Sequence, residues 1–235
     1  MEDNNKRYLA DIAHLLKKLD EGYTLSASEQ AELDAIRELV VKDWNSPLPA
    51  SLGALRSLQS LSTHDSSVPN LDPLIGLTNL QKLELWHTPI NNLTPLASLT
   101  NLASLCLFFL PVCDLEPVSC LTNLIELRMF ETAVSDLSPL AKLTSLVSLE
   151  LASKQVIRLG VLTSLTNVKY LSLMNAKVHD LGSLISGDGW FHACWDVSQS
   201  LINAENSAAT RFCESLCKVT HLRHKKPLCC NDFFA

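Results

Sequence analysis

The chain has 235 residues, is 47% hydrophobic and has a formal net charge of −6. Nucleic-acid binding requires clustered lysine and arginine to neutralise phosphates, and this acidic chain has only the short basic run Arg223–Lys226, so we expect no nucleic-acid partner. The longest apolar run, Leu102 to Cys113, is too short to span a bilayer, so we expect no membrane span.

Residues 1–50 are expected to form a pair of helices. The first has an apolar stripe at helical spacing and a natural stop at Gly22. Its apolar residues are Leu9, Ile12, Leu15, Leu16 and Leu19. The second begins with a capping box between Ser26 and Glu29. The apolar face of this second helix is expected to hold Leu33, Ile36, Leu39 and Val40.

A repeat of 22 residues follows over residues 51–186. Four apolar columns return in register through six units with no insertion, which is the mark of a solenoid. One of these columns holds Leu61, Leu83, Leu105, Leu127, Leu149 and Leu171. Such a pattern has to be interpreted before any local propensity, because each unit can bury its apolar face only against its neighbours.

Each unit predicts one strand and one tight turn. The alternation in Leu83-Glu84-Leu85-Trp86 is typical of a half-buried strand. Proline at the first position of a short helical turn, as in Thr94-Pro95, has no N–H to leave unpaired, and the residue before it is expected to cap the turn. Thr-Asn pairs such as Thr100-Asn101 are expected to hydrogen-bond the turn that leads into the next strand.

The skeleton L-x-x-L-x-L-x-x-T-x-I-x-x-L-x-P-L-x-x-L resembles the leucine-rich-repeat family, and most of all the internalin-type repeat of bacterial proteins. The resemblance covers roughly residues 55–186. It implies an α/β fold: a curved solenoid with a parallel β-sheet on its concave face, short helical turns on its convex face, and helical caps at both ends. The expected domains are a cap over 1–50, six repeats over 51–186 and a cysteine-rich helical cap over 187–235.

The two flanking segments are interpreted as caps because a solenoid exposes the apolar ends of its outermost repeats. A helical hairpin that binds a partner is the alternative for residues 1–50. In the carboxy-terminal segment, apolar residues from Val197 to Val219 recur at helical spacing after a break at Gly187–Gly189.

The residues between the leucines of each strand are expected to face the concave surface. Three consecutive repeats place Trp86, Phe108 and Phe130 in one column, which predicts a stripe of rings about 10 Å long, and Phe109 is expected to extend it. Aromatic residues rimmed by charges are typical of a protein interface. The flanking candidates for partner binding are Lys82, Glu84, Glu126, Arg128, Glu150 and Tyr170.

Five cysteines crowd the carboxy-terminal segment, and one group of them suggests a metal. Cys213, Cys217 and His221 share one face of the expected helix, followed by His224, Cys229 and Cys230, and thiolates and imidazoles bind zinc. The spacing matches no familiar finger, however, and cysteine is also a common small buried residue. Packing within the cap is therefore the favoured interpretation, and we expect no metal.

Cys194-Trp195-Asp196-Val197-Ser198 resembles the segment around the nucleophile of papain-like cysteine proteases, where a helix amino terminus lowers the thiol pKa. Cys194 is likewise expected to begin a helix. This resemblance implies a thiol-dependent enzyme that uses the repeats for substrate recognition. Only 41 residues follow Cys194, however, and a papain-type histidine lies much further from its cysteine.

The repeats contain no carboxylate pair, phosphate-binding loop or triad spacing, so we expect no enzyme activity and no cofactor. The first hypothesis is a monomeric, non-enzymatic module that binds another protein on its concave face. The internalin resemblance implies a bacterial effector or host-interaction protein. The amino terminus is polar and acidic, without the apolar run of a secretory signal. We therefore expect a cytoplasmic protein, or one delivered by a secretion system that needs no signal peptide.

Overall fold

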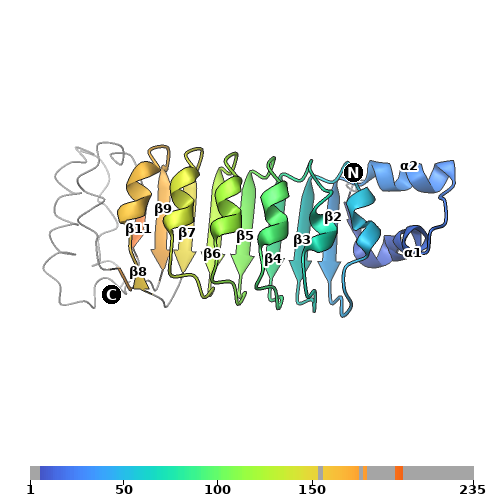
Figure 1. Cartoon of the computed structure of the whole chain (residues 1–235), viewed down its shortest axis with the longest axis horizontal. Coiled ribbons are helices and arrows are strands. Elements are labelled where there is room, and N and C mark those ends of the chain that lie inside the picture. The colour runs from blue at the N-terminus through green and yellow to red at the C-terminus, as the bar shows by residue number, and fades with distance from the viewer. Residues whose placement is uncertain (1–5, 153–155, 175–176, 179–193, 198–235) are drawn as a thin grey trace, which may run out of the picture.

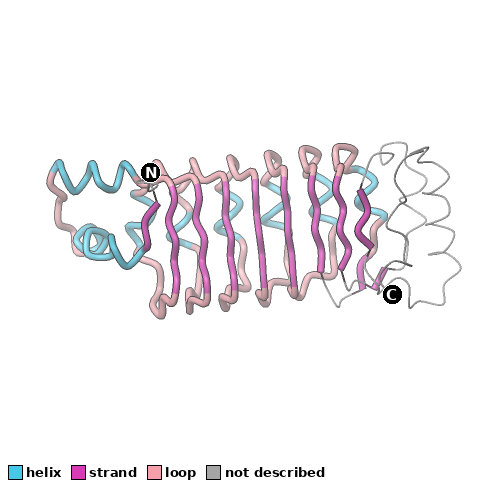
Figure 2. The backbone as a smooth tube through the Cα atoms, turned by 180° about the vertical axis from the view of Figure 1, so that it is seen from behind, coloured by secondary structure: helices cyan, strands magenta, loops and turns pink. Residues whose placement is uncertain are grey.

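The computed structural model describes residues 6–152, 156–174, 177–178 and 194–197. Within these residues one large sheet has nine parallel strands in the order β1-β2-β3-β4-β5-β6-β7-β9-β11. The strands stand side by side along the long axis of the molecule, and a layer of short helices covers one face of the sheet (Figure 1). From behind, the strands lie in front with no described helix over them (Figure 2).

The elements repeat as strand and turn. The strands of the large sheet are β1 Lys6–Tyr8, β2 Glu38–Lys42, β3 Ser60–His64, β4 Lys82–Trp86, β5 Ser104–Phe108, β6 Glu126–Phe130, β7 Ser148–Ala152, β9 Tyr170–Met174 and β11 Cys194–Val197. A second sheet pairs β8 Val156–Ile157 with β10 Lys177–Val178. The 3₁₀-helices are η1 Ala50–Ala54, η2 Asp72–Leu74, η3 Thr94–Ser98, η4 Glu116–Cys120, η5 Ser138–Lys142 and η6 Gly160–Ser164.

The register of the sheet follows the 22-residue period of the sequence. From β3 to β9 each residue pairs with the one 22 positions further on, as Leu83 pairs with Leu105 and Leu105 with Leu127. The leucine columns consequently stack into one continuous core, in which Leu83, Leu105 and Leu127 are fully buried. Burying a leucine side chain contributes about 1.5–3 kcal/mol, so the stacked columns are the main source of stability. The predicted solenoid is confirmed.

The short helical turns lie where the Pro-containing turns were predicted, but their caps differ. The residues before proline, among them Thr94 and Ser138, do not cap the turn. The cap is the side chain two positions before each of these residues. Asn92 Oδ1 accepts from the Thr94 N–H at 2.9 Å, and Asp136 Oδ1 accepts from the Ser138 N–H at 2.8 Å. An Asx side chain favours this bond to its own backbone two residues on, whereas the residue before proline is already inside the turn.

Asparagine links successive repeats, whereas the Thr-Asn pairs were expected to bond the turn that leads into the next strand. Asn101 Nδ2 donates to the Thr78 carbonyl at 2.9 Å, and Asn123 Nδ2 donates to the Thr100 carbonyl at the same distance. Asn79 and Asn167 make the equivalent bonds. Each of these amides satisfies a carbonyl of the previous unit that would otherwise lack a partner, which holds neighbouring units in register.

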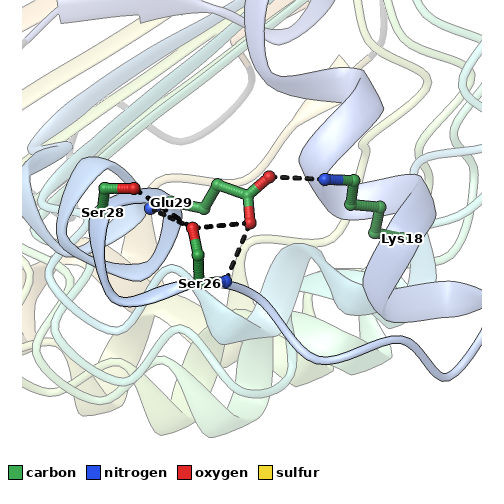
Figure 3. A network of polar contacts seen from close by, with 4 residues as sticks. All are labelled: Lys18, Ser26, Ser28 and Glu29. Carbon is green, nitrogen blue, oxygen red and sulfur yellow. Dashed lines mark hydrogen bonds and ion pairs between the residues drawn. The ribbon is translucent and has the colours of Figure 1, made fainter.

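Two helices precede the repeats, α1 Leu9–Asp20 and α2 Ala27–Ala35. The apolar stripe of α1 is buried and continuous with the repeat core, and Gly22 ends the segment with φ of 84°. The capping box of α2 is confirmed: Ser26 Oγ accepts from the Glu29 N–H, and the Glu29 carboxylate accepts from the Ser26 N–H (Figure 3). Glu29 also pairs with Lys18 of α1, which joins the two helices (Figure 3).

The prediction that the second helix continues through Leu39 and Val40 is wrong. The helix ends at Ala35, and Glu38–Lys42 forms β2, which pairs in parallel with β3. The run Leu39-Val40-Val41 is apolar and largely β-branched, and strand β3 offers an edge whose N–H and C=O groups need partners, so tertiary pairing overrides the helical spacing. A further short strand, β1, pairs with β2.

At the other end, Cys194 does not begin a helix. Cys194–Val197 is strand β11, which pairs in parallel with β9 in the register Cys194 to Tyr170. This pairing extends the large sheet by another strand and gives hydrogen-bond partners to backbone groups at the edge of β9. The expected helix from Val197 to Val219, the Cys213, Cys217 and His221 group and its neighbours His224, Cys229 and Cys230, and the basic run Arg223–Lys226 lie outside the described residues.

Candidate protein-interaction face

The outer face of the large sheet is the side opposite the 3₁₀-helices. Residues at alternate positions of each strand face it, and the burial of β4 follows this pattern, with Leu83 and Leu85 buried and Lys82, Glu84 and Trp86 exposed or half-buried. Strand register then aligns these outer residues into columns that run across the sheet. The predicted site residues of β4 to β7 stand at outer positions of their strands, and their role in binding stays a prediction.

The carboxyl ends of the strands hold a stack of four rings, which we name the aromatic ladder: His64, Trp86, Phe108 and Phe130. Ring centroids are 5.8 Å apart between His64 and Trp86, 3.9 Å between Trp86 and Phe108, and 4.8 Å between Phe108 and Phe130. The last two pairs are within 16° of parallel. Because strands pair in register about 4.8 Å apart, equivalent side chains have to stack. His64 is a member that the sequence interpretation did not include.

Two outer residues are more covered than predicted. Phe108 is only 8% exposed, because Trp86 and Phe130 lie against the two faces of its ring. Cys106 is 2% exposed. Both residues lie on central strand β5, where the longer side chains of the adjacent strands cover the shorter or flatter ones. The expectation that all three rings are directed at solvent is thus wrong for Phe108, which contributes mainly its ring edge.

Burial also changes the chemistry of Cys106. The loss of water, with the nearby Glu84 carboxylate second, raises the pKa of the Cys106 thiol to about 11. A thiol with a raised pKa is protonated at neutral pH and is a poor nucleophile. Cys106 is therefore a packing residue beneath the charged side chains of the face.

Those charged side chains form two groups in the middle of the strands. Lys82 Nζ is 2.9 Å from Glu84, and this hydrogen bond raises the pKa of Lys82. Arg128 lies between two carboxylates, 2.7 Å from Glu126 and 3.0 Å from Glu150. Ser104 Oγ donates to Glu126 at 2.8 Å. Both cations are thus paired with carboxylates of the same face, although their side chains stay partly exposed.

A second ladder lies one residue beyond the strands. Among the described residues, the non-glycine residues with positive φ are Asp43, Asp65, His87, Phe109 and Glu131, at 47° to 57°. We name this set the strand-end ladder. The N–H of each donates to the last carbonyl of the next strand, as the His87 N–H does to Phe108 at 3.0 Å. This bond turns the chain out of the strand and offsets part of the cost of the left-handed conformation.

The strand-end ladder adds a large exposed ring to the face. Phe109 is 47% exposed and stacks on His87, with ring centroids 4.2 Å apart and planes 12° apart. The sequence interpretation predicted Phe109 but missed His87, Asp43 and Asp65. The signal was available, because all of these residues share the position that follows the strand in the 22-residue frame.

Comparison with solved structures places this architecture in a known fold. The chain is similar to an internalin, InlF, of Listeria monocytogenes, with 23% identity and a TM-score of 0.64 over 81% of this chain and 55% of that one. It is also similar to internalin C2 of the same organism, with 26% identity and a TM-score of 0.53 over 79% of this chain and 92% of that one.

A plant peptide hormone receptor, RGFR1, in complex with RGF2 matches with 23% identity and a TM-score of 0.54 over 74% of this chain and 31% of that one. The chain has an internalin-like leucine-rich-repeat fold. It spans about half the length of the matched InlF structure, at 55%. No protein-family model and no curated protein matches the sequence.

Within the leucine-rich-repeat sheet, Tyr170 lies apart from the other candidates. It begins β9 and pairs with Ser148 and Cys194, whereas the aromatic ladder is formed at the ends of β3 to β6. The remaining nine predicted residues come from β4 to β7 and from the position after β5. They form one continuous stretch of the outer face.

The opposite edge of the leucine-rich-repeat sheet, at the strand starts, has a shallow polar depression of about 460 Å³. Arg37, Gln59 and Gln81 are among its lining residues, and none of these is a nucleophile or a general base. The described residues contain no group of three His, Cys, Asp or Glu side chains arranged to hold a metal ion. In that same part of the chain, no helix has the length and apolar character needed to cross a membrane.

Proposed function

We propose that this leucine-rich-repeat protein is a non-enzymatic module that binds another protein through the outer face of its sheet, centred on the aromatic ladder and Phe109. The internalin and receptor neighbours support a protein-binding repeat module in general. The finer assignment, to this face and to these residues, rests on the geometry of the strand ends.

The exposure of Phe109 carries the proposal. A large aromatic side chain is nearly half exposed at a backbone position that costs about 1–2 kcal/mol for an L-residue. Among the described residues its one ring contact is with another exposed side chain, His87, so core packing does not explain it. The same backbone conformation occurs at four other equivalent strand ends, so the feature specific to Phe109 is a large exposed apolar ring, which is typical of a contact site.

The surroundings of Phe109 fit an interface. The aromatic ladder beside it supplies rigid rings already held in place by stacking, which reduces the entropy lost on binding. The Lys82–Glu84 pair and the Glu126–Arg128–Glu150 group form a polar margin around these rings, as the rim of an interface does around its apolar centre. The thiol-enzyme alternative has lost the helix start on which it depended, because Cys194 lies in strand β11.

The decisive experiment is a comparative pull-down with Phe109→Asn. Asparagine tolerates positive φ, so the free energy of unfolding should stay within about 1 kcal/mol of wild type. Recovery of a specific partner should fall at least about ten-fold, as expected for loss of an aromatic anchor. Trp86→Ala should give a similar loss of partner affinity, of about 2 kcal/mol.

Ile75→Asn is the matched control, because Ile75 is 51% exposed and lies after η2, on the helical side of the sheet. It should leave recovery of the partner unchanged. Equal losses in the Phe109 and Ile75 variants, or no loss in the Phe109 variant, would remove the outer face as the binding surface.

A further inference from the structure

The surface around the aromatic ladder has an excess of negative charge. The Glu126–Arg128–Glu150 group sums to −1, and the Lys82–Glu84 pair is neutral. Asp43, Asp65 and Glu131 of the strand-end ladder add −3, and Lys42 at the end of β2 adds +1. With the histidines neutral, the total is −3.

Two of these carboxylates have no side-chain partner within the part of the chain that the structure describes. Asp43 and Asp65 are exposed, and no described residue donates a hydrogen bond or forms an ion pair with either side chain. Their backbone N–H groups bond the last carbonyls of β3 and β4, which places the two residues side by side on neighbouring strand ends. Asp65 is followed along the same ladder by His87 and then by Phe109.

Lys42 is exposed at the end of β2, beside Asp43, whereas the other two cations of the face are held by carboxylates. Lys82 and Arg128 are bound to Glu84, Glu126 and Glu150 within the middle of the strands, whereas the unpaired carboxylates lie at the strand ends. A positively charged group that approaches the strand-end ladder therefore meets free carboxylates beside exposed aromatic rings. A negatively charged partner would have to approach the same carboxylates, and of the cations counted above only Lys42 could receive it.

We propose that the partner presents a basic, arginine-bearing segment to the strand-end ladder, and this proposal rests on the proposed function. A guanidinium pairs with a carboxylate through two parallel hydrogen bonds, which fits Asp43 and Asp65. The same planar group stacks on aromatic rings, which fits the His87–Phe109 pair one and two strands further on. Adjacent strand ends are about 4.8 Å apart, so one arginine side chain can reach both features.

The experiment is an NMR titration of the intact protein with acetyl-Arg-Leu-Arg-Leu-Arg-amide, and with the Glu-for-Arg peptide as its counterpart. The arginine peptide should give saturable shifts of the Asp65, His87 and Phe109 amides, with a Kd below about 1 mM. The glutamate peptide should give none. In the double variant Asp43→Asn/Asp65→Asn the affinity for the arginine peptide should fall at least about five-fold.

The double variant Glu32→Gln/Asp72→Asn is the control, since it makes the same change in net charge on exposed residues of α2 and η2. It should bind the arginine peptide like wild type. The inference is overturned if the arginine peptide does not bind, if the glutamate peptide binds equally well, or if the two double variants behave alike. Such a result leaves the pull-down of the Phe109 variant as the separate test of protein binding by this face.

Discussion

At the scale of single residues, neighbouring outer positions differ sharply in how exposed their side chains are. Cys106 and Phe108 lie on the same strand and face the same side as Trp86, yet both are nearly buried by side chains from the adjacent strands. Phe109, one residue further on, is nearly half exposed because its positive φ turns the chain out of the sheet. Of two adjacent residues, Phe108 thus packs within the sheet, whereas Phe109 is exposed on its surface.

Cys106 gives a pH-dependent prediction. Burial raises its pKa from 9.0 to about 11, so between these values the unfolded chain has lost a proton that the folded chain keeps. Stability must then decrease as pH rises, by about 2–3 kcal/mol over the interval for this one thiol. Chemical denaturation between pH 8 and pH 11 should show this decrease in wild type.

Cys106→Ala serves as the reference, because it shares with wild type every other group that titrates at alkaline pH. Its free energy of unfolding should fall less over the same interval, by about the same 2–3 kcal/mol. Parallel pH profiles of the two proteins would mean that the thiol is accessible to water. Labelling offers a second measurement, since exposed Cys113 and Cys120 should react at neutral pH while Cys106 does not.

The residue scale also shows where sequence interpretation ends. Period and alternation predict which side of the sheet Phe108 and Cys106 face, and the structure confirms it. Their burial could not be predicted, because it depends on how far Trp86, Phe130 and Arg128 reach across from adjacent strands. The positive φ of Phe109 was equally hidden, since phenylalanine does not favour that conformation.

At the scale of elements, sequence signals were reliable where side chains hydrogen-bond backbone groups only a few residues away. The capping box of α2 needs only Ser26 and Glu29, and it was predicted correctly. The end of α2 was not, because Leu39 and Val40 join a sheet edge that exists only once β3 has folded. The caps of the 3₁₀-turns were misplaced for a local reason: Asn92 and Asp136 bond two residues on, before the proline.

The Lys18–Glu29 contact leads to a prediction at this scale. The hydrogen bond from Lys18, and then the Ser26 N–H, hold the pKa of Glu29 at about 2, below its ordinary 4.5. The stabilisation is therefore complete above pH 4.5 and is lost as pH falls through about 2. An NMR titration of the Glu29 carboxyl carbon should give the low value directly.

Lys18→Met should raise the pKa of Glu29, because the largest cause of the depression is removed. Lys17→Met is the matched control: Lys17 pairs with Glu21 on the exposed side of α1, so its removal should leave the Glu29 titration unchanged. If both variants shift the titration equally, general charge rather than the α1–α2 contact holds the pKa down.

At the scale of the whole molecule, the fold is close to one-dimensional. Each coil contacts the coil before and the coil after it, through in-register strands and stacked 3₁₀-turns. Stability in such a molecule is approximately a sum over repeats and their interfaces. The proposed binding surface is not distributed in this way, because the aromatic ladder and Phe109 belong to β3 to β6 and their ends.

Deletion of whole repeats can separate stability from partner binding. Deletion of residues 95–116 removes β5 with Phe108 and Phe109, and deletion of residues 139–160 removes β7 but keeps the whole aromatic ladder. Both cuts fall in equivalent 3₁₀-turns and keep the 22-residue frame, so both chains should fold. Each should lower the heat capacity change of unfolding by roughly 0.3 kcal/mol/K, as expected for 22 residues.

Partner binding should distinguish the two chains. The 139–160 deletion should retain binding within a few-fold of wild type, whereas the 95–116 deletion should lose at least about ten-fold, because the central ring of the ladder and its exposed neighbour are gone. Calorimetry checks the folding of each chain, and a pull-down checks the binding. Equal binding by the two folded deletions would place the interface away from the strand ends, since the 139–160 deletion removes only Glu150 of the proposed interface residues.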